Sequence, residues 1–499
     1  METIEKNTTS DIRTVSQDTT TKNWIGGRWV DSDKQHGTSI NPHTGDPIGT
    51  YANGGLKEAR EAVKEASLAF HESSWKNDHA LRSKVLYAMA DSIEANSEEL
   101  VQMLCTEVGK IAGEAAMEVG TTPPILRYWA GKTFIAGRAG EASPGVHSVV
   151  MREAIGVAGI IAPFNAPVVL TIRALAPALA AGTTVVVKLP GATAQTNGLL
   201  SKIISQTPHL PPGVINFVTE SGSEVATFLV QSPDVPVISF TGSSATGRAI
   251  AAAGATCLKR LVLELGGKTP MIVFDDAPLD MAIPTIVKAV TLFAGQFCMT
   301  GSRILVQRSI ADTLRKRLTE SFATIKAGPG TNPDSDMGAM INQANVQRVN
   351  LMVEAAIAAG AKILVRGGPV TEGKLSKGAY YLPTLLELTD STLPIVQEEV
   401  FGPVATLQVF DTETEAIHLA NDSHYGLAAS IWSQDAGRPW RVAKALQAGT
   451  VWLNTYAQIF PQFEEGGYRQ SGVGRLHGEA GLENFLEYKH IVLNMGAVT

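Results

Sequence analysis

Apolar residues recur at helical spacing over the first third of the chain. This pattern runs from Leu56 through Trp129, where Ala, Glu and Lys fill the polar faces and Asn96 and Gly109 interrupt it. From Ile155 onward, short apolar runs alternate with helical segments. They predict strands over 155–161, 184–188, 214–218, 236–240 and 260–264, and helices over 168–181, 196–206 and 245–253. Such alternation predicts a parallel sheet covered by helices.

A second alternating block starts after Gly267. It predicts strands over 271–274, 304–307, 405–410, 428–432 and 450–453, and helices over 281–294, 311–326 and 343–359. Two α/β layers joined near residues 264–268 predict a cleft between them, where ligand sites concentrate. Residues 139–152 and 485–494 have strand-like patterns that belong to neither layer.

The composition narrows the class of protein. The 499 residues are 44% hydrophobic and 18% charged, as in ordinary globular proteins. The net charge of −7 argues against nucleic acid as the main partner. No apolar run reaches the roughly 18 residues of a membrane-spanning helix. Residues 1–22 are polar and are expected to be disordered, without the features of a secretory or transit signal.

The three cysteines, Cys105, Cys257 and Cys298, are an odd number, widely spaced, and form no metal-ligand pattern. A reducing, cytoplasmic setting without a bound metal is the simplest interpretation. Cys298 differs from the other two because it lies in the segment GQFCMTGSR at 295–303. Upstream lies ELGGK at 264–268, in which Glu264 stands beside a glycine pair. A thiol and a carboxylate in glycine-rich segments indicate covalent catalysis at a carbonyl. The alternative for any of these cysteines is a small buried apolar residue.

Three further motifs complete a recognisable set: PFNAP at 163–167, FTGS at 240–243 and EEVFGP at 398–403. Together with the two segments above, they resemble the aldehyde dehydrogenase superfamily over roughly residues 24–492. The resemblance implies a Rossmann-like cofactor domain over 23–138 and 153–266 and a catalytic domain over 267–465. It also implies a small β segment, 139–152 with 482–499, that joins subunits into a dimer or tetramer.

The resemblance gives catalytic roles to three residues. Cys298 would attack an aldehyde to form a thiohemiacetal, and hydride loss would then give a thioester. Asn165, with the backbone N–H of Cys298, would form the oxyanion hole. Glu264 would activate the water that hydrolyses the thioester, so a free acid is favoured over transfer to coenzyme A. Taken alone, Asn165 could be a turn residue and Glu264 a solvated strand end.

Residues 240–248 follow a predicted strand and open a helix, a geometry suited to an anion. The spacing from Gly242 to Gly247 resembles a phosphate loop, but Arg248 replaces the Lys-Ser/Thr pair that such a loop requires. The G-x-G-x-x-G fingerprint by which ordinary Rossmann domains bind a dinucleotide is also missing from the expected place. By resemblance, Ser243 would meet the pyrophosphate of a dinucleotide.

The remaining cofactor residues are also assigned by resemblance. Lys188 would hold the adenosine ribose and Glu399 the nicotinamide ribose, and Phe164 would stand beside the nicotinamide. Gly191 occupies a position where the family commonly has a glutamate, and loss of that carboxylate permits NADP. NAD remains the first choice. Gly266 and Phe401, from the motifs above, complete this predicted site.

The substrate is the least determined feature. Arg173, on the helix after Pro167, matches an arginine of family members that oxidise succinic semialdehyde or aromatic aldehydes; an ion pair is the alternative. Small Ala166 and apolar Leu292 favour an aromatic or medium apolar aldehyde over succinic semialdehyde. Tyr456 and Ile459 would supply the walls of the tunnel through which the aldehyde enters. The pair Glu464-Glu465 replaces the family's usual Pro-Phe and is compatible with a cationic aldehyde. A non-catalytic relative is least favoured, because Cys298, Asn165 and Glu264 are all present.

Overall fold

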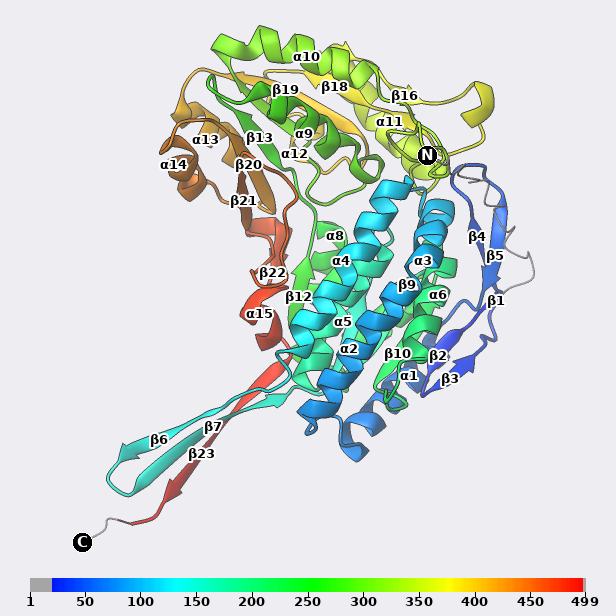
Figure 1. Ribbon diagram of the computed structural model, residues 1–499, viewed down its shortest axis with the longest axis vertical. Coiled ribbons are helices and arrows are strands. Elements are labelled where there is room, and N and C mark those ends of the chain that lie inside the picture. Colours follow the sequence, from blue (N-terminus) through cyan, green and yellow to red (C-terminus); the bar gives the residue numbers. More distant parts are fainter. Residues whose placement is uncertain (1–19, 497–499) are drawn as a thin grey trace, which may run out of the picture.

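The computed structural model describes residues 20–496. Two large sheets, each mainly parallel and flanked by helices, confirm the predicted α/β fold class. One layer lies above the other in Figure 1, and a narrow three-stranded sheet projects from the lower one. Most of the predicted disordered tail lies outside the described residues. Its end does not, because β1 (Thr20–Thr21) pairs in parallel with β5 (Pro47–Tyr51).

The first sheet has eight strands, of which the central five run parallel. Their order reflects crossovers through helices, as the alternating pattern predicts. A hairpin near residue 25 extends one edge antiparallel, an addition that the sequence pattern did not predict. In spatial order the strands are β22 (Gly472–Val473), β12 (Arg260–Glu264), β11 (Val237–Thr241), β8 (Val157–Ile161), β9 (Thr184–Pro190), β10 (Ile215–Glu220), β2 (Asn23–Ile25) and β3 (Arg28–Val30).

Alternating valines show how this sheet is covered on both faces. Val185 and Val187 pack into one apolar cluster and Val186 into another, because successive strand residues point to opposite faces. Helices α2 (His79–Ala95), α4 (Ala112–Ala130), α5 (Pro167–Ala181) and α6 (Ala194–Ser205) cover the first face. Helices α1 (Leu56–Glu72), α7 (Glu224–Gln231) and α8 (Ser244–Gly254) cover the second.

The second sheet has seven strands, all parallel except β15 at one edge. The sequence pattern missed β15 and β18. In spatial order the strands are β15 (Lys362–Val365), β18 (Thr384–Glu387), β19 (Val404–Phe410), β14 (Arg303–Gln307), β13 (Pro270–Val273), β20 (Ala428–Trp432) and β21 (Thr450–Leu453). Helices α9 (Leu279–Thr291) and α10 (Ala311–Ala323) pack on one face, and α13 (Glu413–Asn421) and α14 (Arg438–Ala445) on the other.

Further helices and strands of two small sheets complete the fold. They are α3 (Ser97–Met103), α11 (Gln343–Ala358), α12 (Pro394–Gln397), α15 (Gly478–Glu483), β4 (Gly37–Ile40), β16 (Gly368–Pro369) and β17 (Tyr381–Leu382). After β21 the chain returns to the first sheet, where β22 pairs antiparallel with β12 and places Gly472 opposite Glu264. This return brings residues from the end of the chain to the carboxyl end of β12.

Helix α9 is shorter than the predicted helix over 281–294. It ends at Thr291 because Phe293 and Ala294 take left-handed backbone conformations, with φ of 52° and 53°. L-residues rarely adopt such angles without outside support. The carboxylate of Glu114 on α4 supplies that support, since its Oε1 accepts the Phe293 N–H at 3.0 Å. A tertiary contact therefore ends the helix seven residues before Cys298.

The projecting sheet consists of β6 (Arg138–Ser143), β7 (Val146–Ala154) and β23 (Leu486–Asn494), in the order β23-β7-β6. It stands apart from both large sheets in Figure 1. Phe485 and Leu486 anchor its base in the core, whereas Tyr488 and Val492 are 61% and 57% exposed. None of the helices between residues 20 and 496 combines the length and apolar character of a membrane-spanning segment.

Candidate active site

A cavity of about 460 Å³ lies between residues that follow strands of the first sheet and residues that precede strands of the second. Its walls include the turn after β8, the ends of β11 and β12, the loop before β14 and the turn after α12. The structure thus brings the three predicted catalytic residues to one cavity. The predicted site residues that line it are Phe164, Asn165, Ser243, Glu264, Gly266, Cys298, Glu399 and Phe401.

Cys298 lies on an irregular loop that tertiary contacts hold in place. Gly295 has a φ of 72°, and a Cβ there would lie 2.1 Å from the carbonyl carbon of Gly402. The buried side chain of Gln296 accepts the Ile341 N–H at 3.0 Å and donates to the Phe293 carbonyl at 3.2 Å. The loop position of the thiol is therefore set by its neighbours and not by helix α9.

The surroundings of Cys298 disfavour the thiolate form of its side chain. Burial raises its pKa, nearby Arg173 lowers it, and the carboxylates of Glu465, Glu399 and Glu264 raise it further. Cys105 is buried in the core of the first layer, and burial raises the pKa of its thiol to about 11.

Asn165 lies in the turn between β8 and α5. Its Nδ2 donates to the backbone oxygen of Gln296, two residues before Cys298, at 3.0 Å. The Glu118 carboxylate accepts the Val168 N–H at 2.8 Å and so caps the start of α5, which fixes the end of this turn. The amide therefore faces the loop of the predicted nucleophile and retains a second N–H.

Glu264 ends strand β12 and is almost fully buried, at 4% exposure. Its Oε1 has no hydrogen-bond partner among the described residues. Burial raises the pKa of this carboxyl to about 8; the positive charge of Arg173 lowers it and the negative charge of Glu465 raises it. A buried carboxyl of this kind can accept a proton near neutral pH.

Arg173 pairs with Glu465, so the ion-pair alternative is the one that the structure adopts. The two side chains, 4% and 3% exposed, meet at 2.8 Å between Nη1 and Oε1. His477 Nε2 lies 3.4 Å from the other oxygen of Glu465. His477 was not among the site residues predicted from the sequence. No local pattern could have found it, because its partners are distant along the chain.

The start of α8 forms the wall that is suited to phosphate. Ser243 is the N-cap of this helix, and its Oγ accepts the Thr246 N–H at 3.2 Å. Gly242 and Ser243 both line the cavity. The first backbone N–H groups of the helix are thus available to an anion, as its predicted phosphate role requires.

A second wall suits a flat ring and a sugar. The rings of Phe164 and Phe401 meet edge to face, with centroids 5.8 Å apart. The Glu399 Oε1 accepts the Gly267 N–H at 3.3 Å, and a Cβ at Gly266 would lie 2.4 Å from Oε2. Burial raises the pKa of Glu399 to about 7. Gly266 therefore leaves the space that this carboxylate needs, and these side chains fit a nicotinamide ribose.

Lys188 and Gly191 lie at the end of β9, outside the lining of the cavity. Burial lowers the pKa of Lys188, which the carboxylate of Glu220 counteracts. A Cβ at Gly191 would lie 2.3 Å from the hydroxyl of Tyr51. Tyr51 therefore fills the space that a longer side chain at position 191 would occupy.

None of the five predicted substrate residues lines this cavity. Ala166 and Leu292 are buried together with Phe293 in a small apolar cluster that also touches Leu170 of the cavity wall. The buried Tyr456 donates its hydroxyl to the carbonyl of Met299, beside Cys298, at 2.8 Å. Arg173 is held by Glu465, and Ile459 is exposed.

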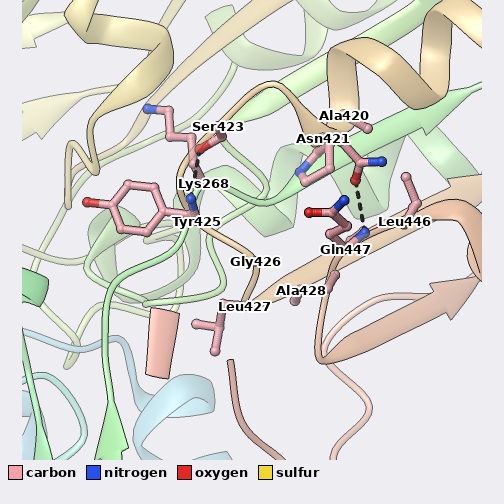
Figure 2. Close-up of a pocket in the computed structure, with 13 residues that line it drawn as sticks. Lys268, Ala420, Asn421, Ser423, Tyr425, Gly426, Leu427, Ala428, Leu446 and Gln447 are labelled. Carbon is pink, nitrogen blue, oxygen red and sulfur yellow. Dashed lines mark hydrogen bonds between the residues drawn. The ribbon is translucent and has the colours of Figure 1, made fainter. Parts of the chain in front are cut away.

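A second pocket, of about 10 Å³, lies beside Lys268 and the segment between α13 and β20 (Figure 2). Asn421 closes one side, where its Oδ1 accepts the Gln447 N–H at 2.9 Å. Burial lowers the pKa of Lys268 to about 7. The pocket has the volume of about one water molecule, so it does not hold a substrate. Among residues 20–496, no three metal-ligating side chains gather into a site.

Comparisons with known proteins place the chain among related enzymes. Residues 29–491 match the model of the aldehyde dehydrogenase family. The chain is 38% identical over 475 residues to the betaine aldehyde dehydrogenase of Bacillus subtilis, covering 94% of this chain and 97% of that protein. It is 37% identical over 480 residues to the mitochondrial succinate-semialdehyde dehydrogenase of Arabidopsis thaliana, covering 95% and 89%.

The structure has a similarly close counterpart. The crystal structure of betaine aldehyde dehydrogenase from Staphylococcus aureus in complex with NAD+ superposes with a TM-score of 0.93. The two chains are 36% identical, and the match covers 95% of each. Likeness of this extent, over sequence and structure alike, is shared by whole proteins and not by a single domain.

Proposed function

The chain belongs to the aldehyde dehydrogenase family of enzymes, and we propose that it oxidises an aldehyde to a carboxylic acid with NAD(P)+. One observation carries this proposal: Cys298, Asn165 and Glu264, which come from three separate segments, line the same cavity. A nucleophile, an oxyanion donor and a general base are the groups that this reaction needs.

The first step is attack by the Cys298 sulfur on the aldehyde carbon. A carbon–sulfur bond forms, the thiol proton is lost to solvent and the carbonyl electron pair moves to oxygen, which gives the oxyanion of a thiohemiacetal. The second N–H of Asn165 and the backbone N–H of Cys298 donate to that oxygen. Donors fixed in advance stabilise such an oxyanion because they need no reorganisation during the reaction.

The cofactor fits the wall formed by Ser243, Glu399 and Phe401. A nicotinamide bound there would supply the hydride acceptor for the thiohemiacetal carbon, whose oxidation gives the thioester of Cys298. Within the chain, Glu399 and Phe401 would orient the ring, and the N–H groups at the start of α8 would bind the pyrophosphate. Lys188 lies at the end of β9, on the adenosine side.

Glu264 then acts on a water molecule. Its carboxylate takes one proton while the water oxygen attacks the thioester carbon, and the Cys298 sulfur leaves as thiolate. The products are the carboxylic acid and the free enzyme. A family member that transfers the acyl group to coenzyme A has less need of a base here, so the buried Glu264 supports hydrolysis.

The cofactor preference is NAD, with NADP tolerated. The Staphylococcus aureus relative is described in complex with NAD+. Gly191 adds no carboxylate beside the adenosine ribose, so nothing at this position repels a 2′-phosphate. The carboxylate of Glu220 favours the protonated form of Lys188 and so adds negative charge to this region. A negative charge disfavours a 2′-phosphate, so it supports NAD as the better cofactor.

The substrate is an aromatic or medium apolar aldehyde. The apolar cluster of Ala166, Leu292 and Phe293 stands beside the cavity. Arg173, the cation that a succinic semialdehyde would use, is already paired with Glu465. Because that charge is neutralised, the semialdehyde alternative lacks a partner for its carboxylate.

A panel of aldehydes tests this function by the absorbance of reduced cofactor at 340 nm. Benzaldehyde-type aldehydes, medium aliphatic aldehydes, betaine aldehyde and succinic semialdehyde are compared by kcat/KM, with and without coenzyme A. We expect coenzyme A to have no effect and the aromatic or aliphatic aldehydes to exceed succinic semialdehyde. Preference for the semialdehyde, lost in Arg173→Ala, would reverse the substrate assignment. No reduction of cofactor by any aldehyde would indicate a non-catalytic relative.

Self-association through the projecting sheet is part of the proposal. Strand β23 is an edge strand with unpaired backbone groups, and it presents Tyr488, Ile491 and Val492 to solvent. Such an edge is stabilised by pairing with another chain. A homo-oligomer, either a dimer or a tetramer, is therefore expected, and a cytoplasmic location stays a prediction from the sequence.

A further inference from the structure

A buried charged cluster lies behind Glu264 and is not used by the reaction described above. It consists of Arg173, Glu465 and His477, all at most 4% exposed. Arg173 Nη1 lies 2.8 Å from Glu465 Oε1, and His477 Nε2 lies 3.4 Å from Glu465 Oε2. Buried polar atoms in this cluster lack a partner among the described residues: Arg173 Nε, Glu465 Oε2 and His477 Nδ1.

The cluster borders the Glu264 carboxyl on two sides. On one side, Arg173 Nη2 donates to Thr241 Oγ1 at 3.4 Å, and Thr241 is the cross-strand partner of Glu264 in the first sheet. On the other side, Gly466 follows Glu465 directly, and a Cβ at Gly466 would lie 3.0 Å from Glu264 Oε1. Arg173 therefore ties together the two segments between which the Glu264 carboxyl lies.

A structural role alone does not account for this pair. Removing two charges from water costs several kcal/mol per ion, so a buried ion pair is often no more stable than apolar residues of similar size. The retained charges therefore point to an electrostatic purpose at the neighbouring carboxyl.

The charged and titratable groups that face Glu264 come from four segments. Arg173 projects from α5, Glu465 from the segment after β21, and Arg475 from the segment after β22; the Cys298 thiol comes from the loop before β14. His477 contributes no charge near neutral pH, because burial lowers its pKa to about 4. Arg173 favours the ionised form of Glu264 and Glu465 opposes it, so the two charges act in opposite directions on the pKa of Glu264.

We propose that Arg173 and Glu465 are positioning residues for Glu264, which fix its carboxyl between Thr241 and Gly466 and balance its charge for proton transfer from water. The proposal rests on the function proposed above, since it concerns the hydrolysis of the thioester. Neither residue touches the reacting atoms. Both act through Glu264, so their removal changes the pH at which hydrolysis becomes effective.

Opposite pH shifts distinguish this role from packing. In Glu465→Gln, the uncompensated Arg173 favours ionised Glu264, so the pH midpoint of kcat falls. In Arg173→Met, the uncompensated Glu465 opposes ionisation, and the midpoint rises. Each shift is expected to be at least about one pH unit, as for buried charges that neighbour a carboxyl. The double variant Arg173→Met/Glu465→Leu restores the balance and a midpoint near that of the wild type.

The experiment measures kcat against pH together with the first-turnover burst of reduced cofactor in each variant. The burst reports attack and hydride transfer, and turnover after the burst reports hydrolysis. Arg315→Met and Glu387→Gln, which break a distant partly buried ion pair, serve as matched controls and leave the midpoint unchanged. Should Arg173→Met not fold, Arg173→Lys keeps the charge and the wild-type midpoint, while Glu465→Gln still shifts it.

The outcomes separate two failures. If the burst is intact but Glu465→Gln leaves the midpoint in place, or if the two single variants shift it in the same direction, the positioning role is overturned. If the wild-type protein gives no burst with any aldehyde, the proposed function itself has failed. Midpoints that move in opposite directions, with bursts preserved, support the proposal.

Discussion

The guanidinium of Arg173 meets the carboxylate of Glu465 at 2.8 Å, although 292 positions separate the two residues in the chain. Arg173 belongs to a helix that covers the first sheet, and Glu465 to the segment by which the chain returns from the second sheet. The site behind Glu264 is therefore complete only when both layers have come together. This couples assembly of the two layers to the electrostatics of the predicted general base.

Replacing Cys298 tests the nucleophile. Cys298→Ala is expected to lower the rate of cofactor reduction by at least roughly a thousandfold, because no other group forms the carbon–sulfur bond. Binding of NAD+, followed by fluorescence titration, should stay near the wild-type value. Cys105→Ala and Cys257→Ala are the controls and should retain turnover. Substantial activity in Cys298→Ala would overturn the mechanism.

Replacing Glu264 tests the base. In Glu264→Gln the amide accepts no proton from water, so steady-state turnover should fall by about a hundredfold or more. The burst of reduced cofactor in the first turnover should remain, because Cys298 is still present. Stopped-flow absorbance at 340 nm measures both phases. Loss of the burst as well would show that Glu264 acts earlier, as the acceptor of the thiol proton.

The pH dependence follows from the raised pKa of Glu264. A carboxyl with a pKa of about 8 is mostly protonated below that pH. Only the ionised form accepts a proton, so turnover limited by hydrolysis should rise about tenfold per pH unit up to about pH 8 and then level off. Measuring kcat from pH 5.5 to 9.5 checks this profile. A flat profile over that range would contradict the assignment.

Cofactor choice is tested at position 191. Gly191→Glu places a carboxylate near the adenosine ribose, and we expect kcat/KM for NADP to fall at least about tenfold more than that for NAD, by about 1.4 kcal/mol. Any side chain here must displace the Tyr51 hydroxyl. Gly191→Gln is the matched control, since it causes the same displacement without the charge. Equal losses for both cofactors in both variants would remove the electrostatic argument.

Self-association is tested by shortening the last strand. Truncation after Glu487 removes the exposed residues of β23 but keeps Phe485 and Leu486, which are buried in the core. Truncation after Gly481 would also remove the buried Phe485 and Leu486, so a loss of folding could not be told from a loss of assembly. Light scattering should give an oligomer for the full chain and a smaller species after truncation. Removal of residues 495–499 alone serves as the control. A monomeric full chain would refute the prediction.

Much of the fold could be predicted from the sequence because its signals are local. The runs at 184–188 and 260–264 became β9 and β12, since a parallel strand that is covered on both faces needs a continuous apolar segment. The strands β15 and β18 were missed. Helix α9 was predicted too long, because a contact between Glu114 and the Phe293 backbone ends it. Local periodicity carries no information about such a contact.

The chemistry divides in the same way. The sequence by itself determined which candidate reactive groups the chain offers, since Cys298, Asn165 and Glu264 stand in recognisable motifs and could be named without coordinates. It left the role of Arg173 open between a substrate contact and an ion pair. Only the tertiary structure decided that question and showed that burial raises the pKa values of Cys298 and Glu264, because charge interactions and burial depend on distance in space and not on distance along the chain.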